Sequence, residues 1–234
     1  MSQDSDMRAR LIKRFYARFV PKAYDENSGA MPDLVKNDQH PEALIISCVD
    51  SRVSPGVIFK MDPGEALIHR HIAGLVPAYD PNWEKDGESP SVAATIEFAV
   101  RNKKVKTLII KGHTHCGGIK AYIDGNASPL INGWMHHARA AFSKVDKSAN
   151  EQETLRAAEQ EVIKYSYHNL MAYPAVREAM MNNELTVEAW IHDIEKGTLL
   201  RFDPKNENFV EISPDGKDFL CTHDDHDVQS CSHN

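Results

Sequence analysis

The amino-acid sequence predicts an α/β protein with a mostly parallel central β-sheet flanked by helices. Three segments rich in apolar and β-branched residues, at 43–47, 66–69 and 105–111, have the length and composition of buried strands. A helical pattern at residues 90–102 separates the second strand from the third, and strands that alternate with helices are typical of parallel sheets. Reactive polar side chains follow the first and third strands, at the edge where such sheets bind ligands.

An amphipathic helix is predicted at the N-terminus. Apolar residues recur at helical spacing from Leu11 through Phe15 to Phe19, and Pro21 is expected to end the helix. We assign residues 1–30 to this helical arm. Its apolar stripe would pack either on the core of its own chain or on a neighbouring subunit.

Helices are also expected on either side of the third strand. Ser89 is placed to cap the helix that precedes this strand, and Pro90 suits the first helical turn. Residues 124–150 have the composition of a loop followed by a short helix at 134–142, and a long helix follows at 151–171.

An antiparallel edge is predicted at the C-terminal side of the sheet. An apolar-rich strand at residues 186–194 leads into a turn at 195–197, and short segments at 198–202 and 209–212 complete the edge. Residues 31–214 therefore form one predicted α/β domain, with no internal repeat.

Composition limits the classes of function. The 234 residues, 41% of them hydrophobic, suffice for a sizeable core without disulfides. The formal net charge of -7 argues against a nucleic-acid-binding surface and suits small neutral or anionic substrates. No run approaches the roughly 18 apolar residues of a membrane helix, and no N-terminal segment has the pattern of a secretory signal. We therefore expect a cytoplasmic location, and an organelle reached after removal of a transit peptide stays open.

The last residues form a polar tail with metal-binding side chains. Residues 215–234 contain few apolar groups, so we expect this tail to be flexible. Three alternatives are open for it: a second specific zinc site, adventitious capture of metal, or no metal binding. The side chains concerned are Cys221, His223, His226, Cys231 and His233.

Two clusters of reactive side chains predict a metal site. Cys48 and Asp50 come at the end of the first strand, where alternate residues share a face, and Arg52 follows Asp50 closely. His113 and Cys116 follow the third strand, in a glycine-containing segment that allows a tight turn. Two thiolates, an imidazole and a carboxylate at paired strand ends suit Zn²⁺.

A purely structural interpretation of the same residues competes with the metal site. Cys48 and Cys116 would then be small buried hydrophobic residues, and His113 a core histidine with satisfied hydrogen bonds. That interpretation leaves Asp50, Arg52 and the neighbouring glycines unexplained.

The segments CVDSRV at residues 48–53 and GHTHCGGI at 112–119 resemble the two signatures of the β-class carbonic anhydrases. The similarity is greatest to the plant-like branch of that family and covers roughly residues 30–200. Further stretches that resemble the family in the same order are PGEA at 63–66, AGLVP at 73–77, IEFAV at 96–100 and YPAVRE at 173–178.

The resemblance implies a carbonic anhydrase, that is, a carbonate dehydratase and zinc lyase. Such an enzyme hydrates CO2 reversibly to bicarbonate and a proton through a zinc-bound hydroxide. Cys48, His113 and Cys116 would hold the Zn²⁺ ion, and the family pattern favours His113 over His115 as the imidazole ligand. Because two thiolates cancel the charge of the ion, the pKa of the zinc water should exceed the roughly 7 of such water elsewhere.

Asp50 and Arg52 would form the catalytic dyad of the family. The Asp50 carboxylate has two possible roles: it accepts a hydrogen bond from the zinc hydroxide, or it binds zinc itself in a closed state that excludes water. A guanidinium fork at Arg52 would hold the carboxylate off the metal.

The resemblance also implies a set of substrate-binding residues. Gln39 and the backbone N–H of Gly117 would hydrogen-bond a carboxylate-like ligand such as bicarbonate. Leu67, Ile72 and Phe98 would line an apolar pocket for CO2.

The sequence departs from the family near this pocket. His71, which follows Arg70, and Gly74 stand where asparagines are customary. Leu67 and Phe98 replace a phenylalanine and a tyrosine, which predicts a slightly wider and drier pocket. These changes leave the turnover rate and the substrate preference open.

Family relatives imply a homodimer or higher homo-oligomer with the pocket at a subunit interface. Two alternative functions stay open. One is hydrolysis of carbonyl sulfide or carbon disulfide, linear analogues of CO2, at the same site. The other is a noncatalytic zinc- or bicarbonate-binding protein, in which Asp50 would bind the metal permanently.

Overall fold

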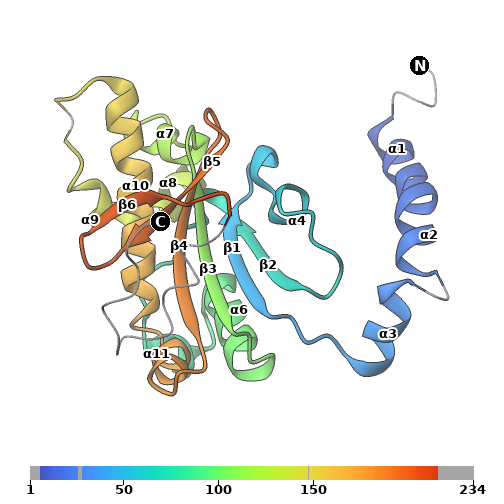
Figure 1. Ribbon diagram of the computed structural model, residues 1–234. Helices are drawn as coiled ribbons and strands as arrows, with labels where there is room; N and C mark the ends of the chain where they lie inside the picture. Colours follow the sequence, from blue (N-terminus) through green and yellow to red (C-terminus); the bar gives the residue numbers. More distant parts are fainter. Residues whose placement is uncertain (1–5, 26–27, 147, 216–234) are drawn as a thin grey trace, which may run out of the picture.

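A six-stranded β-sheet forms the centre of the computed structural model, which describes residues 6–25, 28–146 and 148–215 (Figure 1). The strand order is β2-β1-β3-β4-β5-β6. The strands are β1 (Ala43–Cys48), β2 (Ala66–His71), β3 (Thr107–His113), β4 (Thr186–Asp193), β5 (Thr198–Asp203) and β6 (Asn208–Glu211).

Parallel pairing joins the first four strands, and an antiparallel edge follows. β2, β1, β3 and β4 are parallel neighbours, whereas β5 and β6 pair antiparallel. In this register Cys48 lies opposite His71, and His113 lies opposite His192. The C-terminal ends of β1 and β3 therefore lie side by side. The predicted α/β class, with its parallel sheet and antiparallel C-terminal edge, is confirmed.

Helices cover the sheet and extend from it as an N-terminal arm. The arm contains α1 (Met7–Arg14), a π-helical turn (Phe15–Phe19) and α2 (Val20–Ala23), and α3 (Ala30–Asn37) follows it. The body contains α4 (Pro55–Ile58), α5 (Asn82–Asp86), α6 (Ser91–Glu97) with a π-helical turn (Phe98–Asn102), α7 (Gly117–Ile123), α8 (Pro129–Met135), α9 (Arg139–Phe142), α10 (Glu151–Leu170) and α11 (Pro174–Met181).

One face of the parallel strands carries the main apolar core. Ile46 of β1 and Ile110 of β3 are fully buried there, in a cluster that includes Ile163 of α10. Gly112 faces the same helix, because a Cβ added to Gly112 would lie only 2.5 Å from Ile163 Cγ1. The missing side chain thus lets α10 pack closely against the end of β3, just before the segment that carries the reactive residues.

The sequence predicts that the N-terminal helix ends at Pro21, but the helix continues past this residue. Helical residues continue to Ala23, because the chain widens into a π-helical turn in which the Val20 N–H donates to the Phe15 carbonyl. Pro21 then falls in the first turn of α2, where its missing N–H leaves no hydrogen bond unmade.

Two helix starts also differ from the predictions. Pro90 rather than Ser89 is the N-cap of α6, and no side chain caps that helix. The segment predicted as a loop before residue 134 is helical from Pro129, because a proline suits the first turn of a helix. The long helix α10 begins as expected, with the Asn150 side chain accepting the Glu153 N–H.

The N-terminal arm stands to one side of the sheet and is joined to β1 by an extended segment (Figure 1). No residue of α1 is buried, and the apolar side chains of Leu11 and Phe15 are 54% and 44% exposed. A salt bridge of 2.6 Å between Lys22 and Asp62 links the arm to the body across a groove of about 450 Å³. The apolar stripe of the arm is therefore largely uncovered by the described residues of its own chain.

Within the described ranges, no helix is both long enough and apolar enough to cross a membrane. The metal-binding side chains of the tail come after residue 215, outside the described residues, so a second metal site there stays a prediction. The division into an arm, a catalytic domain at 31–214 and a tail also stays a prediction.

Candidate active site

Three side chains that could together hold a metal ion, referred to as the metal-binding group, meet at the C-terminal edge of the sheet. Cys48 is the last residue of β1, His113 is the last residue of β3, and Cys116 is the N-cap of α7. Their ligand atoms all lie within 4.8 Å of one another, and none of the three residues is more than 4% exposed. The pairing of β1 with β3 thus brings together residues that are 65 positions apart or more in the chain.

The hydrogen bonds of His113 leave one ring nitrogen free for a metal. Nδ1 lies 2.8 Å from the Thr114 carbonyl oxygen, which can only accept, so Nδ1 carries the proton and Nε2 the lone pair. Nε2 is buried without a hydrogen-bond partner among the described residues. A buried polar atom left unpaired costs about 1–3 kcal/mol, which a metal ion at Nε2 would offset.

The two thiols share their protons unequally. The hydrogen bond from Cys116 holds the pKa of the Cys48 thiol well below its usual range, while the same bond and burial raise the pKa of Cys116. The pair therefore carries one negative charge readily, and a divalent cation would displace the second proton. Two sulfurs and an imidazole nitrogen are a donor set that fits Zn²⁺.

A carboxylate-guanidinium pair lies next to the metal-binding group. Arg52 Nε donates to Asp50 Oδ1 at 2.9 Å, and Arg52 Nη2 donates to Oδ2 at 2.6 Å. Asp50 is also the N-cap of the 3-10 turn Ser51–Val53, so Oδ1 accepts the Arg52 backbone N–H at 3.0 Å. The hydrogen bonds from Arg52 hold the pKa of the Asp50 carboxyl far below its usual range. The carboxylate is thus ionised and oriented by three donors.

Arg70 fixes the backbone between the first cysteine and this carboxylate. Its Nε donates to the Cys48 carbonyl at 3.0 Å, and its Nη2 donates to the Asp50 carbonyl at 2.7 Å. This role of Arg70 could not be predicted from the sequence, because backbone acceptors leave no trace in a sequence pattern.

Ile72 packs against the buried cluster that contains Cys48 and Cys116. Two side chains hold its loop in place: Trp134 Nε1 donates to the Ile72 carbonyl at 3.0 Å, and His71 Nε2 lies 2.7 Å from the Leu75 carbonyl. Since a carbonyl only accepts, His71 Nε2 is the donor. His71 therefore closes the loop behind Ile72, which gives a structural reason for an imidazole at this position.

Gly74 and Lys111 approach each other closely behind this loop. Gly74 has a φ of +63°, and a Cβ added there would lie 3.2 Å from the Lys111 carbonyl oxygen, so glycine fits best. The Lys111 side chain is completely buried, and Nζ donates to the Val53 carbonyl at 3.2 Å. Burial lowers the pKa of this ammonium to about 8, partly counteracted by the negative charge of Cys48. The strand pattern gave no indication of this buried cation.

A buried acid accepts a hydrogen bond from the backbone of the second cysteine, Cys116. Glu159 of α10 is 2% exposed, and its Oε1 accepts the Cys116 N–H at 2.7 Å. Its Oε2 accepts from Arg156 Nη1 at 2.7 Å. Burial raises the pKa of Glu159, and these two hydrogen bonds counteract the rise. Sequence reasoning missed Glu159, although an acid among the buried positions of α10 was the available signal.

Comparison with known proteins identifies the family. Residues 43–199 match the family model described as carbonic anhydrase. The chain is also 32% identical over 196 residues to beta carbonic anhydrase 3 of Arabidopsis thaliana, covering 80% of this chain and 74% of the relative. The chain belongs to the β-class carbonic anhydrases.

Solved structures of β-class carbonic anhydrases have the same fold. The β-carbonic anhydrase CcaA superposes with a TM-score of 0.76 at 25% identity, covering 87% of this chain and 90% of CcaA. A tetrameric β-carbonic anhydrase from Sordaria macrospora superposes with a TM-score of 0.69 at 28% identity, covering 83% of this chain and 94% of that one. These matches confirm the family resemblance drawn from the two signatures.

In this β-class carbonic anhydrase the predicted substrate residues fall into two groups. Ile72 and Gly117 lie near the metal-binding group, Gly117 as the first residue of α7 after Cys116. Its N–H belongs to the first helical turn, where backbone donors have no partner within the helix. Leu67 lies near the start of β2, and Phe98, 44% exposed, follows α6.

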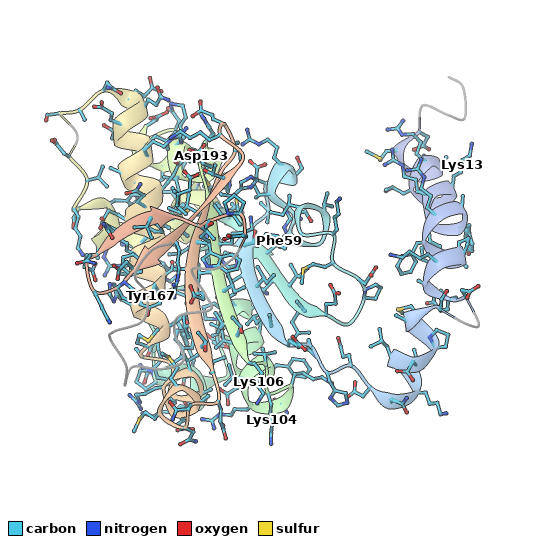
Figure 2. The ribbon with its side chains drawn as sticks, in the orientation of Figure 1. Lys13, Phe59, Lys104, Lys106, Tyr167 and Asp193 are labelled. Carbon is cyan, nitrogen blue, oxygen red and sulfur yellow. The ribbon has the colours of Figure 1, made fainter. Side chains whose placement is uncertain are left out.

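Gln39 belongs with Leu67 and Phe98 to the second group, which lies away from the metal-binding group. It follows Asp38, whose carboxylate pairs with Lys103 at 2.6 Å. Figure 2 shows the neighbouring Lys104 at the end of the sheet opposite Asp193, the last residue of β4. The six residues of β1 alone span about 20 Å between the two ends. A single chain therefore does not bring Gln39 to its own metal-binding group.

Proposed function

We propose that this protein is a zinc enzyme that catalyses the reversible hydration of CO2 to bicarbonate and a proton. The observation that carries the proposal is the buried group Cys48, His113 and Cys116, which ends in an unpaired His113 Nε2 beside an oriented Asp50 carboxylate. When bound, Zn²⁺ would supply a Lewis acid that makes water a nucleophile near neutral pH.

Asp50 is proposed to orient the attacking water. Arg52 occupies one side of the carboxylate with two parallel hydrogen bonds, which leaves lone pairs on the other side to accept a hydrogen bond from water. A water held in this way points its own lone pair at the carbon of CO2. The pairing with Arg52 also keeps Asp50 away from the fourth ligand position.

The apolar surroundings are proposed to receive CO2. Ile72 packs on the buried apolar cluster that contains the two cysteines. Such walls admit a small nonpolar molecule and exclude competing water. The Gly117 N–H is suited to donate a hydrogen bond to the bicarbonate oxygen on which negative charge develops.

The proposal predicts a rate that rises with pH. Because Cys48 and Cys116 cancel the charge of the ion as thiolates, the pKa of the attacking water should exceed roughly 7. Turnover should then increase from about pH 6.5 to 9, a window that brackets this pKa. Stopped-flow hydration of CO2 by zinc-loaded protein measures it.

The same assay separates the competing functions. Carbonyl sulfide and carbon disulfide are offered in place of CO2, and faster turnover of either would make the sulfur-substrate hydrolase the better assignment. A protein that contains zinc but turns over none of the three substrates at any pH would instead be a noncatalytic binding protein.

We also propose that two copies of the chain complete each pocket. Gln39, Leu67 and Phe98 lie away from the metal-binding group of their own chain, while the described part of the chain leaves the apolar stripe of the arm largely exposed. A second copy of the chain would bring its own substrate-binding residues to the metal-binding group and would cover the apolar stripe of the arm. The tetrameric relatives from Sordaria macrospora support a homo-oligomer.

Charge on the apolar stripe should break this assembly. Phe15→Glu combined with Phe19→Glu removes two apolar side chains worth about 1.5–3 kcal/mol each when buried. The dissociation constant should therefore rise by roughly 10²-fold or more, as measured by analytical ultracentrifugation. Met181→Glu, at an apolar position that is 77% exposed on α11, is the matched control. An unchanged mass for the double variant would rule out the arm as the interface.

The cytoplasmic location stays a prediction.

A further inference from the structure

Apart from the dyad of Asp50 and Arg52, a cluster of charged side chains contacts the loop that carries the proposed metal ligands. Arg156 of α10 lies at its centre: Nη1 donates to Glu159 Oε2 at 2.7 Å, and Nη2 lies 3.2 Å from Glu195 Oε2. The same Nη2 lies 2.5 Å from Nε2 of His115. The Arg156 guanidinium on α10 thus contacts both the loop that contains His115 and the turn after β4.

The backbone of His115 needs such support. Its φ is +58°, in the left-handed region that costs a non-glycine residue roughly 1–2 kcal/mol. The same Nε2 also lies 3.0 Å from Glu195 Oε1, but this carboxylate accepts from Arg156 rather than from the ring. Because an arginine can only donate, the ring nitrogen accepts from Arg156. The residue between the last two metal ligands is therefore fixed through its side chain from outside the site.

The carbonyl oxygen of His115 points in the other direction, to the dyad. It accepts a hydrogen bond from Arg52 Nη2 at 3.0 Å, the same nitrogen that donates to Asp50 Oδ2. Arg52 is half-exposed, with 52% of its side chain accessible, so it needs a second anchor to hold one position. The left-handed turn at His115 supplies that anchor by turning its carbonyl toward Arg52.

We infer that Arg156 is a positioning residue that, with Glu195, holds His115 so that Arg52 keeps Asp50 off the fourth ligand position. The inference rests on the proposed function, because it concerns the open state of that site. The hydrogen bonds and ion pairs of Arg156 go to Glu159, Glu195 and His115, so Arg156 acts on the dyad through His115 and Arg52. Its link to Glu159, which accepts the Cys116 N–H, stabilises the same loop at a second point.

The test uses variants that keep the buried acid paired. Arg156→Lys retains a positive charge for Glu159 but loses the planar fork that reaches His115 and Glu195 together. His115→Asn is an independent variant, because asparagine tolerates the left-handed region but lacks the imidazole. Lys164→Met is the matched control, since Lys164 lies on the same helix and pairs with an acid three residues away, Glu161.

Four readouts separate positioning from folding. In Arg156→Lys and His115→Asn, kcat should fall roughly tenfold with KM unchanged, as expected when one hydrogen bond to a charged group is lost and part of the enzyme closes. The visible absorption spectrum of the cobalt-substituted protein should change toward that of Arg52→Ala, while the thermal midpoint and metal content stay near those of wild type. Lys164→Met should match wild type throughout.

An unchanged cobalt spectrum in both variants would overturn the inference, whatever their turnover. A wild-type protein without CO2 hydration would instead contradict the proposed function. The cobalt spectra remain readable in that case, so the two failures are distinguishable.

Discussion

Replacing Cys48 by serine should abolish CO2 hydration. A serine hydroxyl is not ionised near neutral pH and is a poor zinc ligand, so only His113 and Cys116 would remain to hold the ion. Loss of an outer partner of a metal ligand already costs roughly 10–100-fold in affinity, and loss of a ligand itself should cost more. Zinc content after dialysis against a chelator, measured beside turnover, should fall with the activity.

The chain offers a control for this substitution. Cys231→Ser makes the same chemical change outside the segment that matches the family and should keep turnover. Cys116→Ser should behave like Cys48→Ser. Should Cys48→Ser retain its zinc and its rate, the assignment of the three ligands would be wrong.

The residues of the metal-binding group could be predicted from the sequence because each of them is marked by its immediate neighbours in the chain. Cys48 and His113 each end an apolar segment whose strand character is evident, and β1 pairs with β3 directly. Once the sheet is parallel, both strand ends fall on one edge. Residue type and position in the strand therefore placed Cys48 and His113 at this edge, while the preference for His113 over His115 came from the family resemblance.

Residues that act through long-range contacts could not be found in this way. Glu159 reads as one more polar residue of a helix until the packing of α10 places it against the Cys116 N–H. Arg70 acts on two backbone carbonyls, which every residue possesses. Gln39 was recognised only through the family resemblance, and its distance from its own metal-binding group depends on the length of β1.

The helix error at Pro21 has a similar cause. A proline inside a helical pattern usually ends the helix, because it lacks a donor and its ring meets the preceding turn. Here the π-helical turn Phe15–Phe19 shifts the hydrogen bonds by one residue, so α2 starts anew with proline in its first turn. The amphipathic pattern predicted the helix correctly but does not report such a shift.

Removing the guanidinium of Arg52 should close the site rather than merely weaken it. In Arg52→Ala the Asp50 carboxylate loses both bidentate hydrogen bonds, at 2.9 and 2.6 Å, and becomes free to bind the metal as a fourth ligand. We expect kcat/KM to fall by roughly 10²-fold or more, comparable with the loss of a positioned catalytic group. Cobalt-substituted Arg52→Ala should show an absorption spectrum altered by the added carboxylate.

A second substitution tells closure apart from the loss of a positive charge. In an Asp50→Asn background no carboxylate is available to occupy the fourth position, so adding Arg52→Ala should cost little further activity and leave the cobalt spectrum unchanged. Two residues that act as one unit show such non-additivity, whereas independent contributions would multiply. Arg52→Lys should fall between wild type and Arg52→Ala, because an ammonium keeps the charge without the fork. If the double variant instead loses the product of both single effects, Arg52 acts on the substrate directly and not by restraining Asp50.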